Sequence, residues 1–588
     1  MHKPTVPPAI VRLLPVVCAG LALPGCTGPI LERDSGVLSR SVIDAVRREI
    51  SESERSPGYL LTEREGSVES LGIPEDRMSQ LREMGGPGSY MAGELPLDED
   101  LLGESQRMVR LSLERAIRSA AERNAQLQFD RLRPAVAESQ LVVAEANFDW
   151  TFFVNGRYQS IDRPRTSSTF FGTAADVFEQ SDLTTGVRRR LTSGGTFTLD
   201  TSWTWSDNDT PNLTVVPNPA NTVTVGAQLT QPLLRGAGSD VTLSTVRLAE
   251  NAARDEVATL KAAAIRTVRD TEESYWQLVQ AQQNLLIQQR LLERGIDVRD
   301  KIIGRSILDA TDAQIADAKA EVESRKAQVI RAQRSLRAAS DSLKTIINDP
   351  ELTIGSEVML LPADLAIDEP IRFSLVDAVT TALTERPEIA RALLSIDDTT
   401  IRKSIARNQL LPRLDLELST RYAALDRNAE DAYSDVFEGD FLDYIVAVTF
   451  EQPIGNRAAN AELRRRQLEN VQAVSSFQNT VQQVVLEVKN ALRDTVTGYK
   501  LIAQTRAARF AATENLRALE VVIETTGGYT AFNLDQWLTR QQALAVAEGE
   551  EVQALVNYNI AISRLYASIG RTLERNNIKF IVPEAIDE

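Results

Sequence analysis

Two short stretches decide the fold of this sequence: QPLLRGAG, from Gln231 to Gly238, and YIVAVTFEQPIGNRAA, from Tyr444 to Ala459. In each, a strand-like run stops at a Gln-Pro pair and a long helical pattern follows. Proline has no N–H to donate and a fixed φ, so it can end a strand ladder before a helix begins. The glycines that follow allow the chain to change direction. The residues predicted to form these transitions are Pro232, Gly236, Pro453 and Gly455.

The sequence contains two internal repeats with the same order of elements. LSLERAIRSAAERN, from Leu111, and FSLVDAVTTALTERP, from Phe373, both open with Ser-Leu, continue with a helical apolar pattern and reach Glu-Arg. Each copy then passes through strand-like runs, its Gln-Pro pair, a long helix, a loop that contains glycine and a return helix. The offset of about 262 residues is far too long for a solenoid repeat. It indicates two copies of one large hairpin.

The first copy has an insertion. It carries 41 more residues than the second copy between the Ser-Leu opening and the Gln-Pro pair. The extra length includes VRRRLTSGGTFTLDTSWTW, which alternates like a strand pair and turns at Ser193-Gly194-Gly195. We expect this hairpin, at about residues 182–207, either to extend the strand region or to fold over its mouth. The sequence does not decide between these two arrangements.

Two segments are much longer than ordinary globular helices. Val241–Ile303 and Arg457–Thr526 contain no proline and one glycine each. At ~1.5 Å per residue, such helices would measure roughly 95–105 Å. Apolar and small residues recur in both at steps of three and four, which is the pattern of a coiled-coil seam. Return helices at Asp309–Asn348 and Phe532–Ile569 are expected to pack antiparallel against them.

Composition excludes several classes of function. The formal net charge is −17 and basic residues are interspersed with acidic ones, so a nucleic-acid surface is not expected. The one histidine, His2, and both cysteines, Cys18 and Cys26, lie near the start, which leaves no histidine chemistry and no His or Cys metal site. No phosphate-binding glycine loop is present. We therefore expect no enzyme activity, no cofactor, no metal and no nucleic-acid partner.

The first residues have the pattern of a secretion signal. Lys3 and Arg12 precede LLPVVCAGLALPG, an apolar run too short to span a bilayer. The run ends in LPGC, which resembles a bacterial lipobox and predicts cleavage before Cys26 and lipid attachment to it. The alternative is an ordinary signal peptide with an incidental cysteine. No 20-residue apolar stretch follows Cys26, so we expect any membrane crossing to use a closed β-barrel.

Aromatic residues gather at the predicted strands. A membrane barrel carries such residues as girdles, and the core of a soluble sheet would use them too. The residues concerned are Phe148, Trp150, Phe152, Phe153, Tyr158, Trp203 and Trp205.

Strand pairs joined to long helical hairpins, twice in one chain behind a bacterial leader, resemble the TolC-like outer membrane efflux protein family. The resemblance covers about Leu111 to Glu574. It rests on the Ser-Leu openings, the two transitions, the return helices ILDATDAQIADAKAE and NLDQWLTRQQALAVAE, and the closing YNIAISRLYASIGRTLE. No single motif is decisive, but the order and spacing of all of them are specific.

The resemblance implies a mainly α fold with a membrane β-barrel portion. Duplicated helix-strand-strand-helix hairpins from three chains would form one 12-stranded barrel, continued by a long α-helical coiled-coil tube. The implied protein is a lipid-anchored homotrimer in the outer membrane of a Gram-negative-type bacterium, with its tube in the periplasm. It would be the exit duct of a tripartite efflux or type I secretion system, passively conducting substrates from an inner-membrane pump and a periplasmic adaptor.

The expected organisation follows from these boundaries. A lipoprotein signal peptide at 1–25 is followed by an N-terminal periplasmic extension at 26–105. The first repeat covers 106–350, with strands at about 148–160 and 221–232, and a linker at 351–372 joins it to the second repeat. The second repeat covers 373–572, with strands at about 411–424 and 443–453, and a C-terminal tail occupies 573–588.

The family's tube narrows at the loops between long and return helices, often at rings of aspartate. The resemblance places Asp535, Asp309 and Asp312 as candidates for this periplasmic aperture. Phe532 stands where a second family aspartate would be, and TTGGYTAF lacks the arginine that locks the family's closed state. Alternatively, Asp309 and Asp535 act only as helix caps or first-turn acids.

A rival interpretation is a periplasmic coiled-coil adaptor or scaffold lipoprotein without a pore. Its strands would then be the core of a small soluble domain. The duplication argues against an adaptor, since an adaptor needs only one long hairpin.

Overall fold

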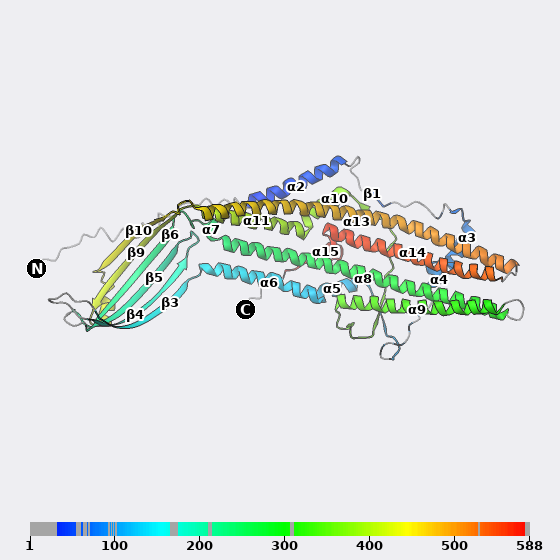
Figure 1. The fold of residues 1–588 in the computed structure, drawn as a ribbon, viewed down its shortest axis with the longest axis horizontal. Coiled ribbons are helices and arrows are strands. Elements are labelled where there is room, and N and C mark those ends of the chain that lie inside the picture. Colours follow the sequence, from blue (N-terminus) through cyan, green and yellow to red (C-terminus); the bar gives the residue numbers. More distant parts are fainter. Residues whose placement is uncertain are drawn as a thin grey trace.

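The computed structural model describes residues 32–53, 60–62, 68, 71–91, 95, 97, 99, 101, 103–164, 175–209, 215–305, 311–526 and 530–582. The molecule is elongated: a twisted sheet forms one end, and long helices run from it to the other end (Figure 1). The predicted signal peptide and Cys26 lie outside the described residues.

One antiparallel sheet contains strands from both repeats. Its order is β10-β9-β6-β5-β4-β3, and every neighbouring pair in it is antiparallel. The two repeats meet where β6 pairs with β9, with Val225 opposite Tyr422. The strands are β3 (Thr151–Pro164), β4 (Ala175–Arg190), β5 (Thr196–Asn208), β6 (Ala220–Pro232), β9 (Arg413–Asp426) and β10 (Leu442–Glu451).

The inserted hairpin extends the strand region. It forms β4 and β5, which lie within the sheet between β3 and β6, and its turn places Gly194 at φ 97°. The expected 12-stranded trimer assumed four strands in each chain, and that number is wrong because the insertion brings the sheet to six. The sequence signal was present in the alternating residues on either side of Gly194.

In the described part of the chain, the long helices form a wall that is four helices wide near the sheet and again farther from it. Near the sheet, α6 (Ala125–Glu145) packs on α8 (Ser244–Gly304), and α11 (Pro387–Asn408) lies between α8 and α13 (Arg457–Thr526). Farther from the sheet, α9 (Asp312–Ile347) packs on α8, while α14 (Ala531–Ile569) packs on both α8 and α13. Figure 1 shows these elements side by side.

The repeated sequence openings are helix starts. Ser112 and Ser374 cap α5 (Leu113–Arg123) and α10 (Leu375–Glu385), each accepting a hydrogen bond from a backbone N–H three residues on. After Glu-Arg, Asn124 caps α6, and Pro387 takes the first position of α11, where a missing N–H costs nothing. The two copies therefore use the same break between paired helices.

Shorter elements complete the described part of the chain. They are α2 (Glu32–Ser53), β1 (Leu60–Leu61), α3 (Glu75–Met84), α4 (Pro87–Tyr90), β2 (Met108–Leu111), the 3-10 turn Ala146–Phe148, α7 (Ser239–Thr242), β7 (Met359–Pro362), β8 (Arg372–Phe373), α12 (Ala429–Asp435) and α15 (Thr572–Arg575). β1 pairs with β8, and β2 pairs in parallel with β7.

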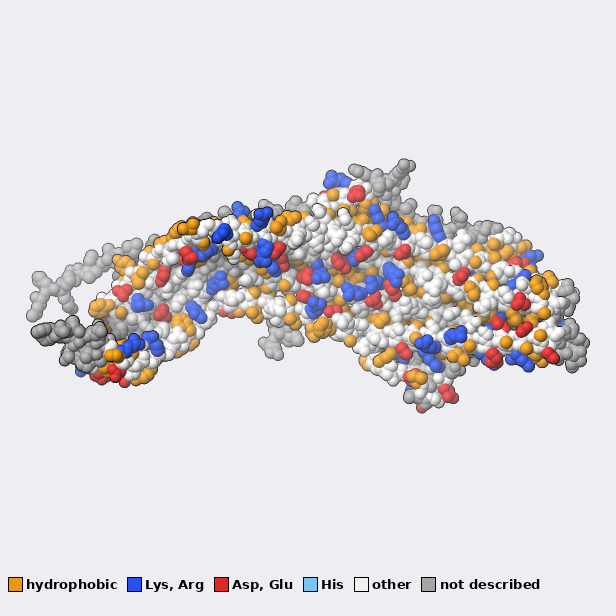
Figure 2. Space-filling view, in the orientation of Figure 1, with side chains coloured by type: hydrophobic (Ala, Val, Ile, Leu, Met, Phe, Trp, Pro, Cys, Tyr) orange, Lys and Arg blue, Asp and Glu red, His pale blue; other side chains and the backbone are white. Residues whose placement is uncertain are grey.

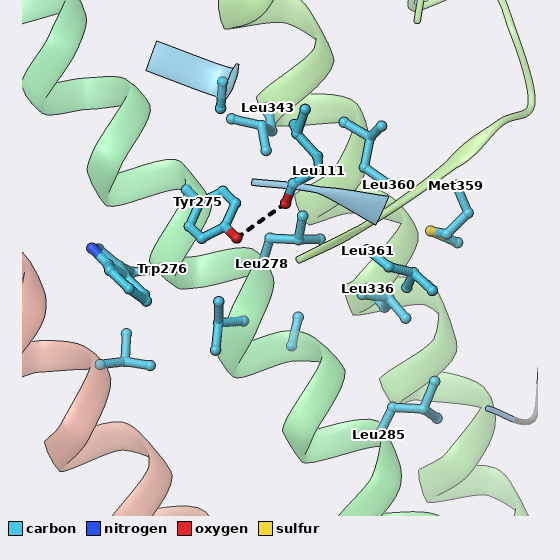
Figure 3. Packing of buried hydrophobic residues seen from close by; sticks show 14 of the residues in the cluster. Leu111, Tyr275, Trp276, Leu278, Leu285, Leu336, Leu343, Met359, Leu360 and Leu361 are labelled. Atoms are coloured by element: carbon cyan, nitrogen blue, oxygen red, sulfur yellow. Dashed lines mark hydrogen bonds between the residues drawn. The ribbon is translucent and has the colours of Figure 1, made fainter. Parts of the chain in front are cut away.

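A buried cluster at mid-height joins the linker to the helices. Leu111 of β2 and Leu360 of β7 pack with Leu278 and Leu343 of α8 and α9 (Figure 3). The hydroxyl of Tyr275, which is fully buried, lies 3.0 Å from the carbonyl oxygen of Leu111 and 2.8 Å from a carboxylate oxygen of Asp364. It also accepts hydrogen bonds from the backbone N–H groups of residues 363 and 364. Burial raises the pKa of this phenol.

Tyr275→Phe tests this junction. The change leaves the ring packed but removes the hydrogen bonds of the buried phenol, including those it accepts from the partly buried N–H groups of residues 363 and 364. We therefore expect a loss of about 0.5–1.5 kcal/mol in the free energy of unfolding. Denaturant unfolding followed by circular dichroism measures the loss. Tyr433→Phe, at an exposed tyrosine, makes the same chemical change and should have no effect. Equal stability of both variants would contradict the role given to Tyr275.

Candidate functional site

The sheet has one apolar face. Directly opposed residues in an antiparallel pair share a face, and successive residues of one strand alternate between faces. In β10, alternate residues from Leu442 to Phe450 are apolar and exposed. The apolar face comprises Phe152, Val154, Tyr158, Leu183, Val187, Phe197, Leu199, Trp203, Trp205, Val223, Val225, Leu229, Leu416, Leu418, Tyr422, Leu442, Tyr444, Val446, Val448 and Phe450.

The opposite face of the sheet is polar. Arg157 of β3 forms a 2.8 Å ion pair with Asp182 of β4, which also accepts a 3.0 Å hydrogen bond from Thr204 of β5. Gln228 of β6 donates to Glu417 of β9 at 2.7 Å. These polar contacts join β3 to β5 and β6 to β9 on one face of the sheet. Apolar and polar faces on one exposed sheet are the pattern of a sheet that separates hydrocarbon from water.

The predicted transitions lie where the sheet meets the helices. Pro232 ends β6 opposite Asp415, but Leu233 donates to the Leu414 carbonyl at 2.7 Å and Arg235 to the Pro412 carbonyl at 3.2 Å. The backbone pairing therefore continues three residues past the proline. Gly236 follows with φ 85° and donates its N–H to Asn408 at 2.7 Å. In the second copy, Pro453 and Gly455 (φ 87°) lie between β10 and α13. Both glycines adopt a backbone conformation that other residues rarely take.

The far ends of the helical hairpins contain the candidate aperture residues. Asp312 is the first residue of α9, and Asp309 lies outside the described residues. The caps are threonines: Thr311 caps α9 with a reciprocal contact to Gln314, and Thr530 caps α14. The first turn of α14 holds no acidic residue, so the alternative that Asp535 is only a cap or first-turn acid is wrong.

Asp535 lines an open groove between α9 and α14. The groove has a volume of about 610 Å³, and Asp317 and Glu321 of α9 line it as well. These two acids were missed by the sequence reasoning, although their spacing of four residues places them on one face of a helix. The groove therefore presents three carboxylates from two repeats.

Arg325 joins the two hairpins near this end. Its guanidinium, fully buried, donates at 2.9 Å to the Leu291 carbonyl of α8 and to Gln541 of α14. It also pairs with Glu321 on its own helix at 2.8 Å. The side chain passes α8 at Gly295, where a Cβ would lie 2.8 Å from its Nη1. The contact thus depends on a glycine in α8. Arg325 lies within α9, away from the TTGGYTAF loop, and the sequence analysis did not single it out.

Residues 71–91, which we call the docked segment, lie against the same helices. Arg509 of α13 donates to the Gly85 carbonyl at 2.8 Å, and the Gly86 N–H donates to Glu548 of α14 at 2.7 Å. Arg294 of α8 donates to the carbonyl of Met84. The docked segment therefore bonds to helices of both repeats.

Glu548 is an incompletely hydrogen-bonded part of this contact. Its Oε2 is buried and has no hydrogen-bond partner among the described residues. Burial raises the pKa of Glu548 above its ordinary value of 4.5, against the opposing effect of Arg294. The folded chain therefore holds this proton more tightly than the unfolded chain does. The stability contributed by the group is fully present below its unfolded pKa and is lost as the pH rises through the folded pKa.

No helix in the described part of the chain is both long enough and apolar enough to cross a membrane. Among the same residues, no cluster of three or more His, Cys, Asp or Glu side chains could hold a metal ion. On the face shown in Figure 2, basic and acidic side chains are interspersed along the helices.

No protein-family model matches the sequence, and no curated protein matches it. Solved structures do match. The CmeC outer membrane channel of Campylobacter jejuni is 15% identical, with a TM-score of 0.58 over 78% of this chain and 86% of CmeC. The MtrE outer membrane channel of Neisseria gonorrhoeae is 19% identical, with a TM-score of 0.53 over 82% of this chain and 96% of MtrE. The outer membrane protein VceC of Vibrio cholerae is 13% identical, with a TM-score of 0.54 over 78% of this chain and 96% of VceC. The chain has the fold of TolC-like outer membrane channels.

Gly295→Ala tests the Arg325 contact. The new methyl group would overlap a side chain that hydrogen bonds hold in place, so we expect a loss of about 1–3 kcal/mol. Gly549→Ala is the matched control, because that helical glycine faces open space and alanine should stabilise it by about 0.5–1 kcal/mol. Thermal unfolding in detergent, followed by circular dichroism, compares the two. Similar melting temperatures would show that Arg325 is not confined at Gly295.

Glu548→Gln tests the docked segment. Glutamine keeps an acceptor for the Gly86 N–H but has no charge to desolvate, so the melting temperature of this variant should exceed that of the parent increasingly as the pH rises above 4.5. Glu550→Gln, at an exposed neighbour, should follow the parent at every pH. A difference between Glu548→Gln and the parent that does not grow with pH would contradict the assignment.

Proposed function

We propose that this chain, which has the fold of TolC-like outer membrane channels, is itself an outer membrane channel. Three copies would join their sheets into one closed cylinder in the membrane, continued by their helices as a tube through the periplasm. The channel would passively conduct substrates delivered by an inner-membrane pump and a periplasmic adaptor of an efflux or type I secretion system. It would perform no chemical step.

The two-faced sheet is the observation that carries this proposal. An apolar face of this extent costs free energy in water and gains it in hydrocarbon, while the polar face suits a water-filled lumen. Among the described residues of one chain, the sheet ends at β3 and β10, and each of these strands has a partner strand on one side only. Unpaired backbone groups at those edges are tolerated poorly in lipid, so closure needs further copies.

Aromatic residues near both ends of the apolar face support its placement in a membrane. Phe197 lies at the end near the helices, where Trp150 packs against it edge-on at 6.2 Å. Trp205 lies near the other end of the same strand, and Trp203 beside it bonds to Asn221 at 2.9 Å. Phe197 and Trp205 lie roughly 27 Å apart along the strand, which at a tilt of ~40° is a height of roughly 21 Å. Membrane barrels have an apolar band ~25 Å tall between aromatic girdles.

The arrangement of the helices is consistent with a tube whose far end carries acidic residues. Asp535, Asp317 and Glu321 lie in one groove near the hairpin ends, and Asp312 begins α9. Three copies of these carboxylates around an axis would concentrate negative potential and favour cations. Asp309, whose position is not described, remains part of the proposed aperture on sequence grounds alone. The adaptor would contact these hairpin ends.

The proposed membrane anchor is Cys26, lipidated after cleavage of residues 1–25. It rests on the LPGC motif alone. The rival function, a coiled-coil adaptor or scaffold lipoprotein without a pore, would give the apolar face another protein as its cover in place of lipid.

Purification from membranes and planar-bilayer recording test the channel directly. We expect a trimer that only detergent extracts, that dissociates on heating and that gives discrete conductance steps. A protein that stays monomeric in plain buffer and never conducts would refute the channel and favour the scaffold.

Asp535→Asn tests the acidic opening. Loss of three charges at the proposed aperture should lower the cation-to-anion permeability ratio roughly twofold or more, because fixed charge near the axis sets the local ion concentration. Reversal potentials across a salt gradient measure this ratio. Glu550→Gln, farther along the same helix, should leave it unchanged. If both variants select ions like the parent, Asp535 does not face the conducting path.

A further inference from the structure

We propose that β10 of one copy pairs with β3 of the next, and that the cylinder contains eighteen strands because each sheet contributes six. The inference rests on the proposed channel and specifies how its wall closes. The partner at each sheet edge is a second copy of this chain.

β4 and β5 are full members of the sheet. β3 pairs with β4 from Thr151 to Pro164, and β5 pairs with β6 from Thr196 to Ser206. In this arrangement β3 is separated from β6 by two strands, so the insertion cannot lie outside the wall without breaking both ladders. The contact of Asp182 with Arg157 and Thr204 joins β3, β4 and β5 on the polar face as well.

The inserted hairpin is also fixed at its turn. The Gly238 N–H donates to the Ser193 carbonyl at 3.0 Å, and the Ser193 hydroxyl bonds to Gln231 at 2.8 Å. Gly194 faces the Gly236 carbonyl so closely that a Cβ would lie 2.3 Å from it. The turn between β4 and β5 is therefore built into the transition from sheet to helix.

The two free edges suit one another. Six alternating strands leave β3 and β10 antiparallel, so β10 of one copy meets β3 of the next with the antiparallel sense that runs through the whole sheet. Alternation also matches, because Val154 on β3 and Val446 on β10 belong to the same apolar face and are both exposed. An odd number of strands would have placed parallel strands at the junction.

The widths of sheet and helical wall agree. A row of four helices at 8–10 Å spacing spans roughly 32–40 Å. Six strands at ~4.8 Å spacing, tilted by 35–45°, span roughly 35–41 Å, whereas four strands span only roughly 23–27 Å. Six strands per copy therefore continue the helical wall without narrowing it. At a tilt of ~40°, eighteen strands enclose a cylinder roughly 36 Å across, against roughly 24 Å for twelve.

Disulfide trapping in the purified, detergent-solubilised protein tests the strand order. Val154→Cys with Thr185→Cys places cysteines directly opposite one another on β3 and β4 and should form a disulfide within one chain. Val154→Cys with Val225→Cys spans from β3 to β6, roughly 14 Å, and should not. A link from β3 to β6 in place of the link to β4 would overturn the eighteen-strand wall.

The edge is tested by combining Val446→Cys with Val154→Cys, Gly156→Cys or Tyr158→Cys, which sample three registers on one face of β3. We expect at least one combination to give covalently linked dimers and trimers on denaturing gels. Val446→Cys with Asn155→Cys is the matched control, since Asn155 lies on the polar face and should not link. No edge link in a preparation that conducts ions overturns the β10–β3 pairing alone, while absence of both trimers and conductance overturns the channel itself.

Discussion

The backbone N–H and C=O groups along the outer edges of β3 and β10 are the constraint on which the rest of the structure depends. Every other strand of the sheet has a neighbour on both sides, whereas in the part of the chain that the structure describes these two have a neighbour on one side only. Their apolar residues are exposed, so water is a poor solvent for the side chains and lipid is a poor solvent for the open edge. The edges and the apolar face together are satisfied only if copies of the chain complete one another. The need for further copies follows from this requirement, and the number three comes from the likeness to TolC-like channels.

In the proposed trimer, the helices must stay packed in register over a length of about 100 Å. Long antiparallel pairs supply length, but a row of helices can shear, and the described contacts oppose this at distinct heights. Tyr275 joins the linker to α8 at mid-height, while Arg325 and the docked segment join the two repeats nearer the hairpin ends. Arg325 and Glu548 are buried polar groups, and such groups are costly when a partner is lost. They restrict how the hairpins can move relative to one another close to the acidic groove.

The sequence predicted the helices well because their signals are local. Ser112 and Ser374 cap α5 and α10. Proline is absent from α8 and α13, and the spacing of apolar residues marks the face along which these helices pack. The transition roles of Pro232 and Pro453 stay predictions; β6 ends at Pro232 and β10 ends two residues before Pro453. The number of strands was wrong, because whether β4 and β5 join the sheet depends on pairing with distant residues such as Phe152 and Leu229. Arg325, Asp317 and Glu321 escaped notice because an ion on a long helix usually faces water, and only the packing of α9 against α8 and α14 gives these three residues their surroundings.

Hydrogen–deuterium exchange of the strand amides in the lipid-reconstituted protein tests the central claim most directly. If β10 of one copy pairs with β3 of the next, amides of both edge strands will exchange as slowly as those of β6 and β9 in the middle of the sheet. Rapid exchange confined to β3 and β10, with the central strands protected, would show that the edges stay open and would contradict the account.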